Sequence, residues 1–240
     1  MYKGLKIGVV VLAYKVEKQI KGVIESLPHF IDKVYVVDDG SPDSTAEIVK
    51  AFNHSRVNLI RHGINSGPGM ALSTGYQAAL ADNMDIVVKL DGDGQMSPNQ
   101  IENLIMPIIR GEADYTKGNR LSRPELHYSM PRFRLFGNRM LTLLTRIASG
   151  YWHINDSQNG FTAISREALQ AIKPSLYPYY GYLNDLLVQL NVHHFKTLDV
   201  PMPAKYGGER SSIRLNKYVP KLSWLLLISF LWRLKMKFLK

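Results

Sequence analysis

The feature that most constrains the fold is a regular alternation of short apolar runs with stretches of helical spacing. β-branched apolar runs occupy residues 5–12, 34–37, 57–60 and 86–90, whereas apolar residues recur at helical spacing within 18–27, 41–52 and 69–81. Short continuous apolar runs are typical of buried strands, and the second spacing is typical of helices. The alternation therefore predicts an α/β fold with a mostly parallel central sheet and helices on its faces.

Length and composition predict one domain with a basic end. A chain of 240 residues with 45% hydrophobic residues is long enough to bury one substantial core. We expect one domain over residues 1–214 and a basic, apolar segment over 215–240. The chain has no cysteine, and its start lacks the features of a secretory signal. We therefore expect the protein to stay on the side of the membrane where it is made.

Acidic residues follow two of the predicted strands directly. Asp38 and Asp39 come after the run at 34–37, and Asp91 and Asp93 come after the run at 86–90. In open parallel sheets, ligands bind beyond the carboxyl ends of the strands. The two acidic pairs are therefore candidates for one binding site at that edge of the sheet.

The second acidic pair belongs to a series of oxygen-bearing side chains. Asp91, Asp93 and Gln95 are spaced two residues apart, so an extended backbone would project them to one side. Such hard donors suit Mg²⁺ or Mn²⁺, whose shell is commonly completed by water and substrate phosphates. Gly92 would let a diphosphate approach the backbone. The segment thus predicts a divalent metal that neutralises a departing nucleoside diphosphate.

Three other interpretations compete for this segment. An EF-hand loop is rejected because Met96 stands where that loop needs glycine. A phosphotransferase could use Asp91 as nucleophile and Asp93 as acid, but it leaves the first acidic pair without a role. One carboxylate could instead cap the helix expected near Pro98, although we do not expect this of both.

The first acidic pair and a glycine-rich segment add a second part of the predicted site. Asp38 or Asp39 could cap the following helix, and the other could accept a hydrogen bond from a ribose hydroxyl or a base. Residues 63–69 are glycine-rich and enter the helix predicted from Gly69, which would place backbone N–H groups near a phosphate. Alone, the glycine signal is weak.

Positive charge is concentrated in two segments. Residues 117–146 carry seven Lys or Arg against one Glu, and residues 205–240 carry nine against one, within a net charge of +10 for the chain. Local positive charge attracts phosphates of nucleic acid, anionic lipid or a phosphorylated substrate. A non-enzymatic basic protein that binds nucleic acid or membrane would explain these segments but not the carboxylates.

Both basic segments contain candidates for membrane contact. Within 131–147, apolar residues fall on one side of a helix: Phe133, Phe136, Met140, Leu143, Leu144 and Ile147. This pattern resembles an interfacial helix, but a core helix with a basic outer face explains it too and is our default. The apolar run at 222–232 is too short to span a bilayer. It suits either a helix in the headgroup region or a helix packed on the domain.

Three motifs, in this order and spacing, carry a resemblance to a known family. VYVVDDGSPDST, NSGPGMALSTGYQAAL and KLDGDGQMSP resemble glycosyltransferase family 2, the inverting transferases of GT-A fold. GEADYTKGNR, RLFGN and NDSQNGFTAISREAL are similar to the branch that includes dolichol-phosphate mannose synthase and bacterial enzymes of surface-polysaccharide assembly. The resemblance covers roughly residues 5–210, and the combination is specific although no single motif is.

The resemblance implies a nucleotide-sugar site and assigns roles to residues of this chain. Asp38 and Asp39 would contact the nucleoside, and the series from Asp91 through Gln95 would hold the metal and the diphosphate. Asp185 would be the general base toward a hydroxyl acceptor, and Asp93 would be essential for catalysis. Further donor or phosphate contacts are implied for Ala13, Tyr14, Glu17, Arg120 and Arg210.

The sequence also departs from the family pattern. One extra residue precedes Glu17 in the segment after the first strand, which alters the donor contacts expected there. Asn159 and Thr162 stand where the lipid-phosphate branch has serine and arginine, which weakens the assignment of a polyprenyl-phosphate acceptor.

Together these features predict a metal-dependent inverting transferase. It would move a hexose from a UDP- or GDP-sugar to polyprenyl phosphate or to a lipid-linked glycan, in the synthesis of cell-surface polysaccharide or glycolipid. We expect the protein at the cytoplasmic face of a membrane with an anionic surface. We expect no nucleic-acid partner. The sequence does not decide whether the protein forms a homo-oligomer.

Overall fold

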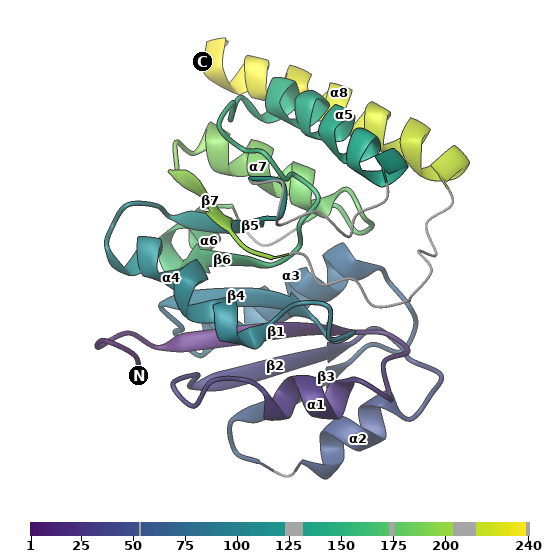
Figure 1. The fold of residues 1–240 in the computed structure, drawn as a ribbon, viewed down its shortest axis with the longest axis vertical. Coiled ribbons are helices and arrows are strands. Elements are labelled where there is room, and N and C mark those ends of the chain that lie inside the picture. The colour runs from purple at the N-terminus through teal and green to yellow at the C-terminus, as the bar shows by residue number, and fades with distance from the viewer. Residues whose placement is uncertain (53, 123–131, 173–175, 204–214, 239–240) are drawn as a thin grey trace.

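The computed structural model describes residues 1–52, 54–122, 132–172, 176–203 and 215–238. One seven-stranded sheet lies at its centre (Figure 1). The strands are β1 Ile7–Ala13, β2 Lys33–Asp38, β3 Val57–Arg61, β4 Ile86–Asp91, β5 Tyr115–Asn119, β6 Thr162–Ser165 and β7 Thr197–Pro201. The helices are α1 Ile20–Glu25, α2 Thr45–Ala51, α3 Pro68–Ala81, α4 Ile101–Ile109, α5 Arg132–Ser149, α6 Arg166–Ala171, α7 Tyr182–Val192 and α8 Leu215–Phe238, with a short 3₁₀ helix, η1, at Pro98–Gln100.

The strand order confirms the predicted mostly parallel sheet. The order is β3-β2-β1-β4-β6-β5-β7, and β6 alone runs antiparallel to its neighbours β4 and β5. All four predicted strands in the first 91 residues are present and pair in parallel. Their carboxyl ends therefore meet at one edge, as the position of the acidic residues requires.

Helices cover both faces of the sheet and divide its core into two layers. On one face, apolar residues of the strands pack against α1, α2 and α4, through residues such as Val23, Val49 and Leu104. On the other face they pack against α3, α6 and α7, through residues such as Leu72 and Leu187. Strands that are apolar on both sides fit this arrangement, because a sheet covered on both faces buries every side chain.

Two predicted helices begin later than their apolar spacing suggests. Residues 41–44 precede α2 as a loop, in which the backbone N–H of Ser41 donates to Asp38 and the N–H of Ser44 donates to Glu17. Side-chain acceptors thus satisfy backbone groups that a longer helix would have satisfied internally. The helix α1 is likewise shorter than the predicted 18–27.

A third layer, formed by α5 and α8, lies outside α7 (Figure 1). The two helices lie side by side, and their shared core contains Ala148, Val188, Leu222 and Leu226. Arg233 of α8 donates to the carbonyls of Ile147 and Ala148, near the end of α5. The helix α8 is therefore packed on the domain, as one of the two interpretations of 222–232 requires.

The default interpretation of 131–147 as a core helix is wrong. Within the described side chains of α5, an apolar stripe is exposed to solvent: Phe136, Met140, Leu143, Leu144 and Ile147. The stripe points away from the domain because α7 and α8 contact the opposite, smaller side of the helix, at residues such as Thr145 and Ala148. Apolar periodicity identifies a face but not what covers it.

The helix α8 also keeps an exposed apolar stripe beside its packed one. This stripe consists of Trp224, Leu227, Ile228, Leu231 and Trp232. Together with the stripe of α5 it forms what we call the α5/α8 face. Among the described residues, no helix is long and apolar enough to cross a membrane.

Candidate active site at the strand ends

The sheet brings the two acidic pairs to neighbouring strand ends. Asp38 ends β2 beside Ala13, the last residue of β1, and Asp91 ends β4 beside Leu12 on the other side of β1. Adjacent strands lie about 4.8 Å apart, so one strand separates the two acidic groups. The predicted convergence at the carboxyl edge is therefore present in the structure.

The segment from Asp91 to Gln95 is a turn rather than an extended strand. The strand β4 ends at Asp91, and Gly94 has a φ of +76°, a left-handed conformation that favours glycine. Asp93 Oδ1 accepts a hydrogen bond from the backbone N–H of Gln95 at 2.9 Å. The expected extended backbone is therefore wrong for this segment, and the turn sets the positions of these side chains.

Gly92 has a packing role that the sequence did not reveal. Its N–H donates to the carbonyl of Leu12 at 2.8 Å, and an added Cβ would lie 3.1 Å from that carbonyl oxygen and from Ile20. The glycine therefore lets the turn approach β1 and α1. This packing role stands beside the expected close approach of a diphosphate to Gly92, which stays a prediction.

Asp91 is held by a lysine of its own strand. Lys89 Nζ lies 2.7 Å from Asp91 Oδ1, and the lysine side chain is fully buried whereas that of Asp91 is 36% exposed. The sequence analysis placed this lysine inside an apolar run and assigned it no role, although a buried charge is rare unless it is paired. Its pairing with Asp91 gives the exposed carboxylate a fixed orientation.

The donor set of the turn fits a divalent cation that binds together with a phosphate ligand. Two carboxylates and one amide, each partly exposed, stand on one turn. Within the described residues, no group of three or more His, Cys, Asp or Glu side chains could hold an ion by itself. Mg²⁺ and Mn²⁺ sites that borrow oxygens from substrate phosphates need only one or two carboxylates.

Asp38 and Asp39 are bound by the protein itself. Asp38 is fully buried, lies 3.2 Å from Nε of Arg61 and accepts the N–H of Ser41. Asp39 contacts Nδ1 of His62 at 2.8 Å. It also accepts the backbone N–H groups of Ser66 and Gly67 at 2.9 and 2.8 Å. These contacts occupy much of the acceptor capacity of Asp39, whereas Oδ2 of Asp38 has no hydrogen-bond partner among the described residues, and the nucleoside role of the pair stays a prediction.

The glycine-rich loop is directed toward the protein rather than toward a ligand. The N–H of Gly69 donates to the carbonyl of Pro178 at 2.7 Å, and those of Ser66 and Gly67 donate to Asp39. A Cβ at position 69 would lie 1.9 Å from the carbonyl oxygen of Tyr177. The expectation that Gly69 offers its N–H to a phosphate is therefore wrong, because that group is already bonded.

The segment after β1 lies beside Asp38 and Asp39. The carbonyl of Ala13 accepts the N–H of Asp39 at 2.9 Å, and Tyr14 is 42% exposed at this edge. Lys15 has a φ of +56°, and its N–H donates to Ser41. Glu17 accepts the N–H of Ser44 at 3.0 Å. The unusual segment is thus attached to the loop after β2, where the predicted donor contacts would lie.

Arg120 is fixed by a buried aspartate that the sequence analysis assigned no role. Its Nε and terminal nitrogen lie 2.7 and 3.0 Å from the two oxygens of Asp156, which also accepts its backbone N–H. Burial opposes ionisation of Asp156, but Arg120 and Lys117 hold its pKa below the ordinary value. The phosphate contact predicted for Arg120 remains a prediction. No local pattern in the sequence identified Asp156 as its partner.

Asp185 lies in the first turn of α7. Burial raises its pKa, which suits a group that accepts a proton, while the N–H of Tyr177 and the amide of Gln189 donate to its Oδ2. The same end of α7 reaches the turn after β4, because the ring of Tyr182 lies 5.8 Å from Lys89 Nζ. Arg210, the remaining predicted contact, lies outside the described residues.

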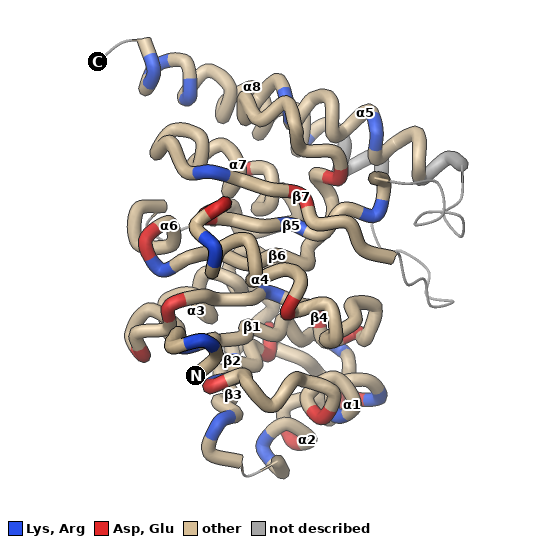
Figure 2. The backbone as a smooth tube through the Cα atoms, turned by 60° about the vertical axis from the view of Figure 1, so that its left-hand side comes forward, with Lys and Arg blue, Asp and Glu red and all other residues tan. Residues whose placement is uncertain are grey.

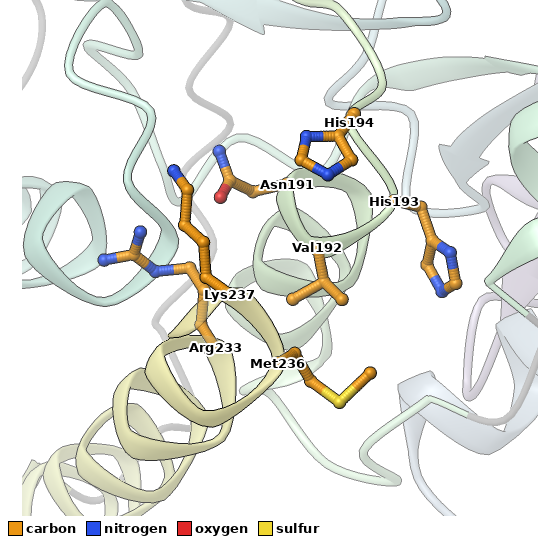
Figure 3. Close-up of a pocket in the computed structure, with 7 residues that line it drawn as sticks. All are labelled: Asn191, Val192, His193, His194, Arg233, Met236 and Lys237. Atoms are coloured by element: carbon orange, nitrogen blue, oxygen red, sulfur yellow. The ribbon is translucent and has the colours of Figure 1, made fainter. Parts of the chain in front are cut away.

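A hollow elsewhere is unrelated to these groups (Figure 3). The last turn of α7 and the following residues line it from one side, and Arg233, Met236 and Lys237 of α8 line it from the other. It lies at the end of α7 opposite Tyr182, about 15 Å away at the rise of an α-helix. Nothing in its lining matches the predicted donor site.

Comparisons with known proteins agree with the geometry. The glycosyl transferase family 2 profile matches residues 8–173. The chain is 35% identical, over 70% of its length and 72% of the relative's, to a UDP-N-acetylglucosamine–dolichyl-phosphate N-acetylglucosaminyltransferase of Methanococcus voltae. It is 26% identical, over 81% and 75% of the two chains, to a polyprenol monophosphomannose synthase of Mycolicibacterium smegmatis.

Solved structures share the fold. A glucosyl-3-phosphoglycerate synthase from Mycobacterium tuberculosis, crystallised with Mn²⁺, uridine diphosphate and phosphoglyceric acid, superimposes with a TM-score of 0.71. The match covers 96% of this chain and 78% of that one at 22% identity. The fold with acidic groups at neighbouring strand ends, together with the profile match, establishes that this chain belongs to glycosyltransferase family 2.

Proposed function

We propose that the protein transfers a sugar from a nucleotide-sugar donor to a lipid-linked acceptor, with inversion at the anomeric carbon. The observation that carries this proposal is the position of the two acidic pairs, at the ends of β2 and β4 on either side of β1, in a family 2 chain. Family membership favours glycosyl transfer over the phosphotransferase and over a non-enzymatic basic protein. Neither alternative gives both acidic pairs a role.

The reaction is a single in-line displacement. An acceptor oxygen forms a bond to the anomeric carbon as the bond to the nucleoside diphosphate breaks, and the electron pair leaves with the diphosphate. A divalent ion bound at this site would supply positive charge to the leaving diphosphate. Asp91, Asp93 and Gln95 would hold that ion, and Arg120 would orient a phosphate from the guanidinium position fixed by Asp156.

Polyprenyl phosphate is the acceptor that the observations favour. The two relatives named above act, by their names, on dolichyl phosphate and on a polyprenol. An anionic phosphate oxygen needs no base, and Oδ2 of Asp185 already accepts two hydrogen bonds from the protein. A lipid-linked glycan is the second candidate. In that case Asp185 would take the proton from the attacking hydroxyl, which the raised pKa of this aspartate supports.

The α5/α8 face would bring the protein to an anionic membrane that contains the acceptor. The face is apolar and exposed, and the two helices carry arginines and lysines but no acidic residue (Figure 2). Exposed apolar side chains with basic flanks are typical of helices that lie in the headgroup region. Both helices begin at the side of the domain toward which β1 runs (Figure 1). The strand ends thus open on the same side of the domain as the first turns of the two helices (Figure 1).

The test is a transfer assay on vesicles that contain polyprenyl phosphate. The protein is incubated with Mn²⁺ and a panel of UDP- and GDP-hexoses, and the lipid fraction is analysed for a sugar phosphodiester. The proposal predicts one accepted nucleotide, a lipid-linked product and an inverted anomeric configuration. A product of retained configuration would contradict the mechanism. Transfer that needs a lipid-linked glycan and ignores the bare polyprenyl phosphate would replace the favoured acceptor by the second.

A further inference from the structure

Two buried lysines form a row across the sheet beneath the proposed metal site. Lys89 of β4 and Lys117 of β5 both align with Thr162 of β6, so their side chains point to the same face. Both lysines are fully buried. A buried ammonium group is costly unless a charge or a hydrogen-bond acceptor satisfies it. The partners of the two lysines therefore indicate what each one does.

The two lysines have different partners. Lys117 Nζ donates to the backbone carbonyl of Asn159, whereas Lys89 Nζ lies 2.7 Å from the Asp91 carboxylate. The partner of Lys117 is a neutral group of the loop before β6. The partner of Lys89 is one of the two carboxylates assigned to the metal. The Lys89 pair thus connects the buried row to the proposed metal site, whereas the charge of Lys117 acts on Asp156, the partner of Arg120.

The space around the Lys89 ammonium group is closed. A Cβ at position 160 would lie 2.6 Å from Nζ, so Gly160 leaves room for this group and for no side chain of its own. The buried ring of Tyr182 lies 5.8 Å away on the side of α7. The ammonium group is thus enclosed between Asp91 and Tyr182 and has no contact with solvent.

This arrangement sets the charge that an incoming cation meets. Asp91 and Asp93 together carry two negative charges, and the fixed ammonium group of Lys89 offsets one of them. A bare divalent ion at Asp91 Oδ1 would share that oxygen with the buried ammonium group. A nucleoside diphosphate brings the missing negative charge. Without it, Coulomb repulsion between the divalent ion and the ammonium group, both in contact with one carboxylate, opposes binding of the ion.

We propose that Lys89 is a positioning residue that orients Asp91 and opposes the binding of a bare divalent cation, so that metal and nucleotide bind together. The inference rests on the proposed metal role of Asp91 and Asp93. By linkage, the nucleotide raises the affinity for the metal by the same factor by which the metal raises the affinity for the nucleotide. Removing the Lys89 charge strengthens metal binding in the absence of nucleotide.

The experiment is a titration of the full chain with Mn²⁺, in which electron paramagnetic resonance measures the free ion, with and without UDP or GDP. The variants are Lys89→Met, which removes the charge at similar length, and Lys89→Gln, which keeps a donor for Asp91. Lys117→Met is the matched control, because it removes the other buried lysine of the row. Asp93→Ala reports whether the ion binds at this turn.

The wild-type protein is expected to bind Mn²⁺ at least tenfold more tightly with nucleotide than without it. The two Lys89 variants should bind bare Mn²⁺ at least tenfold more tightly than the wild type, and Lys117→Met should stay within twofold of the wild type. Either Lys89 variant decides the question if the other fails to fold.

Two results would overturn the inference. The first is an affinity of the folded Lys89 variants for bare Mn²⁺ that equals or falls below that of the wild type. The second, which needs no variant, is a wild-type affinity that nucleotide changes less than threefold. Failure of the proposed function looks different, because Mn²⁺ would then bind neither with nor without nucleotide, or would bind Asp93→Ala unchanged.

Discussion

The strand-end site and the α5/α8 face differ in which side chains they bury: the first buries charged groups, and the second exposes apolar ones. At the strand ends, each of two fully buried charged side chains has an oppositely charged partner that is partly exposed: Asp156 is paired with Arg120, and Lys89 with Asp91. On the α5/α8 face, apolar side chains such as Phe136 and Trp224 are exposed, at 65% and 64%. Buried charges need fixed partners, whereas exposed apolar surface indicates a partner outside the chain.

This difference predicts which substitutions change chemistry, which change folding and which change location. At the strand ends, removal of an exposed ligand should stop turnover, and removal of a buried partner should destabilise the fold. On the α5/α8 face, a polar substitution should leave the fold unchanged and weaken binding to lipid, and with it transfer to an acceptor in the membrane.

The largest effect is expected for Asp93→Ala. Loss of this carboxylate removes a contact to the metal and diphosphate. Turnover should therefore fall by about 10³-fold or more, which is the size of effect seen when an enzyme loses a group that stabilises charge in the transition state. The fold should be intact, because Asp93 lies on a partly exposed turn. A transfer assay together with the melting temperature checks this, with the exposed Glu25→Ala as control. Activity within tenfold of the wild type would show that the metal assignment is wrong.

Arg120→Met should destabilise the protein by about 3 kcal/mol or more, because it leaves the fully buried Asp156 without its charge partner. Urea unfolding measures the loss, and Arg120→Met combined with Asp156→Asn should recover part of it.

The pH dependence of this loss follows from the lowered pKa of Asp156. Ionised Asp156 stabilises the wild type above the ordinary aspartate pKa of about 4, and this stabilisation is lost as the pH falls through the lower native pKa. The gap in free energy of unfolding between wild type and Arg120→Met should therefore narrow below about pH 4. A gap that is constant with pH would contradict a charge effect.

On the α5/α8 face, the combined change Trp224→Glu and Ile228→Glu should weaken binding to anionic vesicles by about tenfold or more, because it replaces inserted apolar groups by charge. Stability should change by about 0.5 kcal/mol or less, since both side chains are exposed. Leu226→Ala on the buried side of the same helix is the matched control. It should cost about 2 kcal/mol or more in stability, and the folded variant should still bind vesicles. Unchanged vesicle binding by the double variant would remove the membrane role of this face.

The smallest effect is expected for Asp185→Asn. With polyprenyl phosphate as acceptor, kcat should fall less than tenfold, because an anionic acceptor needs no base, whereas a hydroxyl acceptor would lose about 10²-fold or more. The ratio of kcat for the wild type to kcat for Asp185→Asn therefore indicates which kind of acceptor the site uses. The pH profile of kcat distinguishes loss of a base from a structural disturbance.

The sequence predicted the elements whose signal is local. The strands and helices up to Asp91 follow from apolar spacing, and the acidic residues after β2 and β4 follow from the rule that ligands bind at strand ends. The place of β6 between β4 and β5 was not predictable in the same way. Strand order depends on pairing between distant segments, which spacing does not encode.

The partners of charged residues were the other part that the sequence did not show. Asp156 and Lys89 look like ordinary polar positions in a loop and a strand, and their roles come from groups brought close by the fold. The exposed stripe of α5 was misassigned for a related reason. Its spacing identifies an apolar side, but only the packing of α7 and α8 shows that this side faces away from the domain.

The measurement that tests the account most directly is the thermal unfolding of the purified chain with UDP and with GDP, each with and without Mn²⁺. A ligand that binds only the native state raises the melting temperature. The account predicts a rise with one nucleotide that requires Mn²⁺ and that is absent in Asp93→Ala. No rise with either nucleotide, or a rise that is the same without Mn²⁺ and in Asp93→Ala, would contradict a metal-dependent donor site at the strand ends.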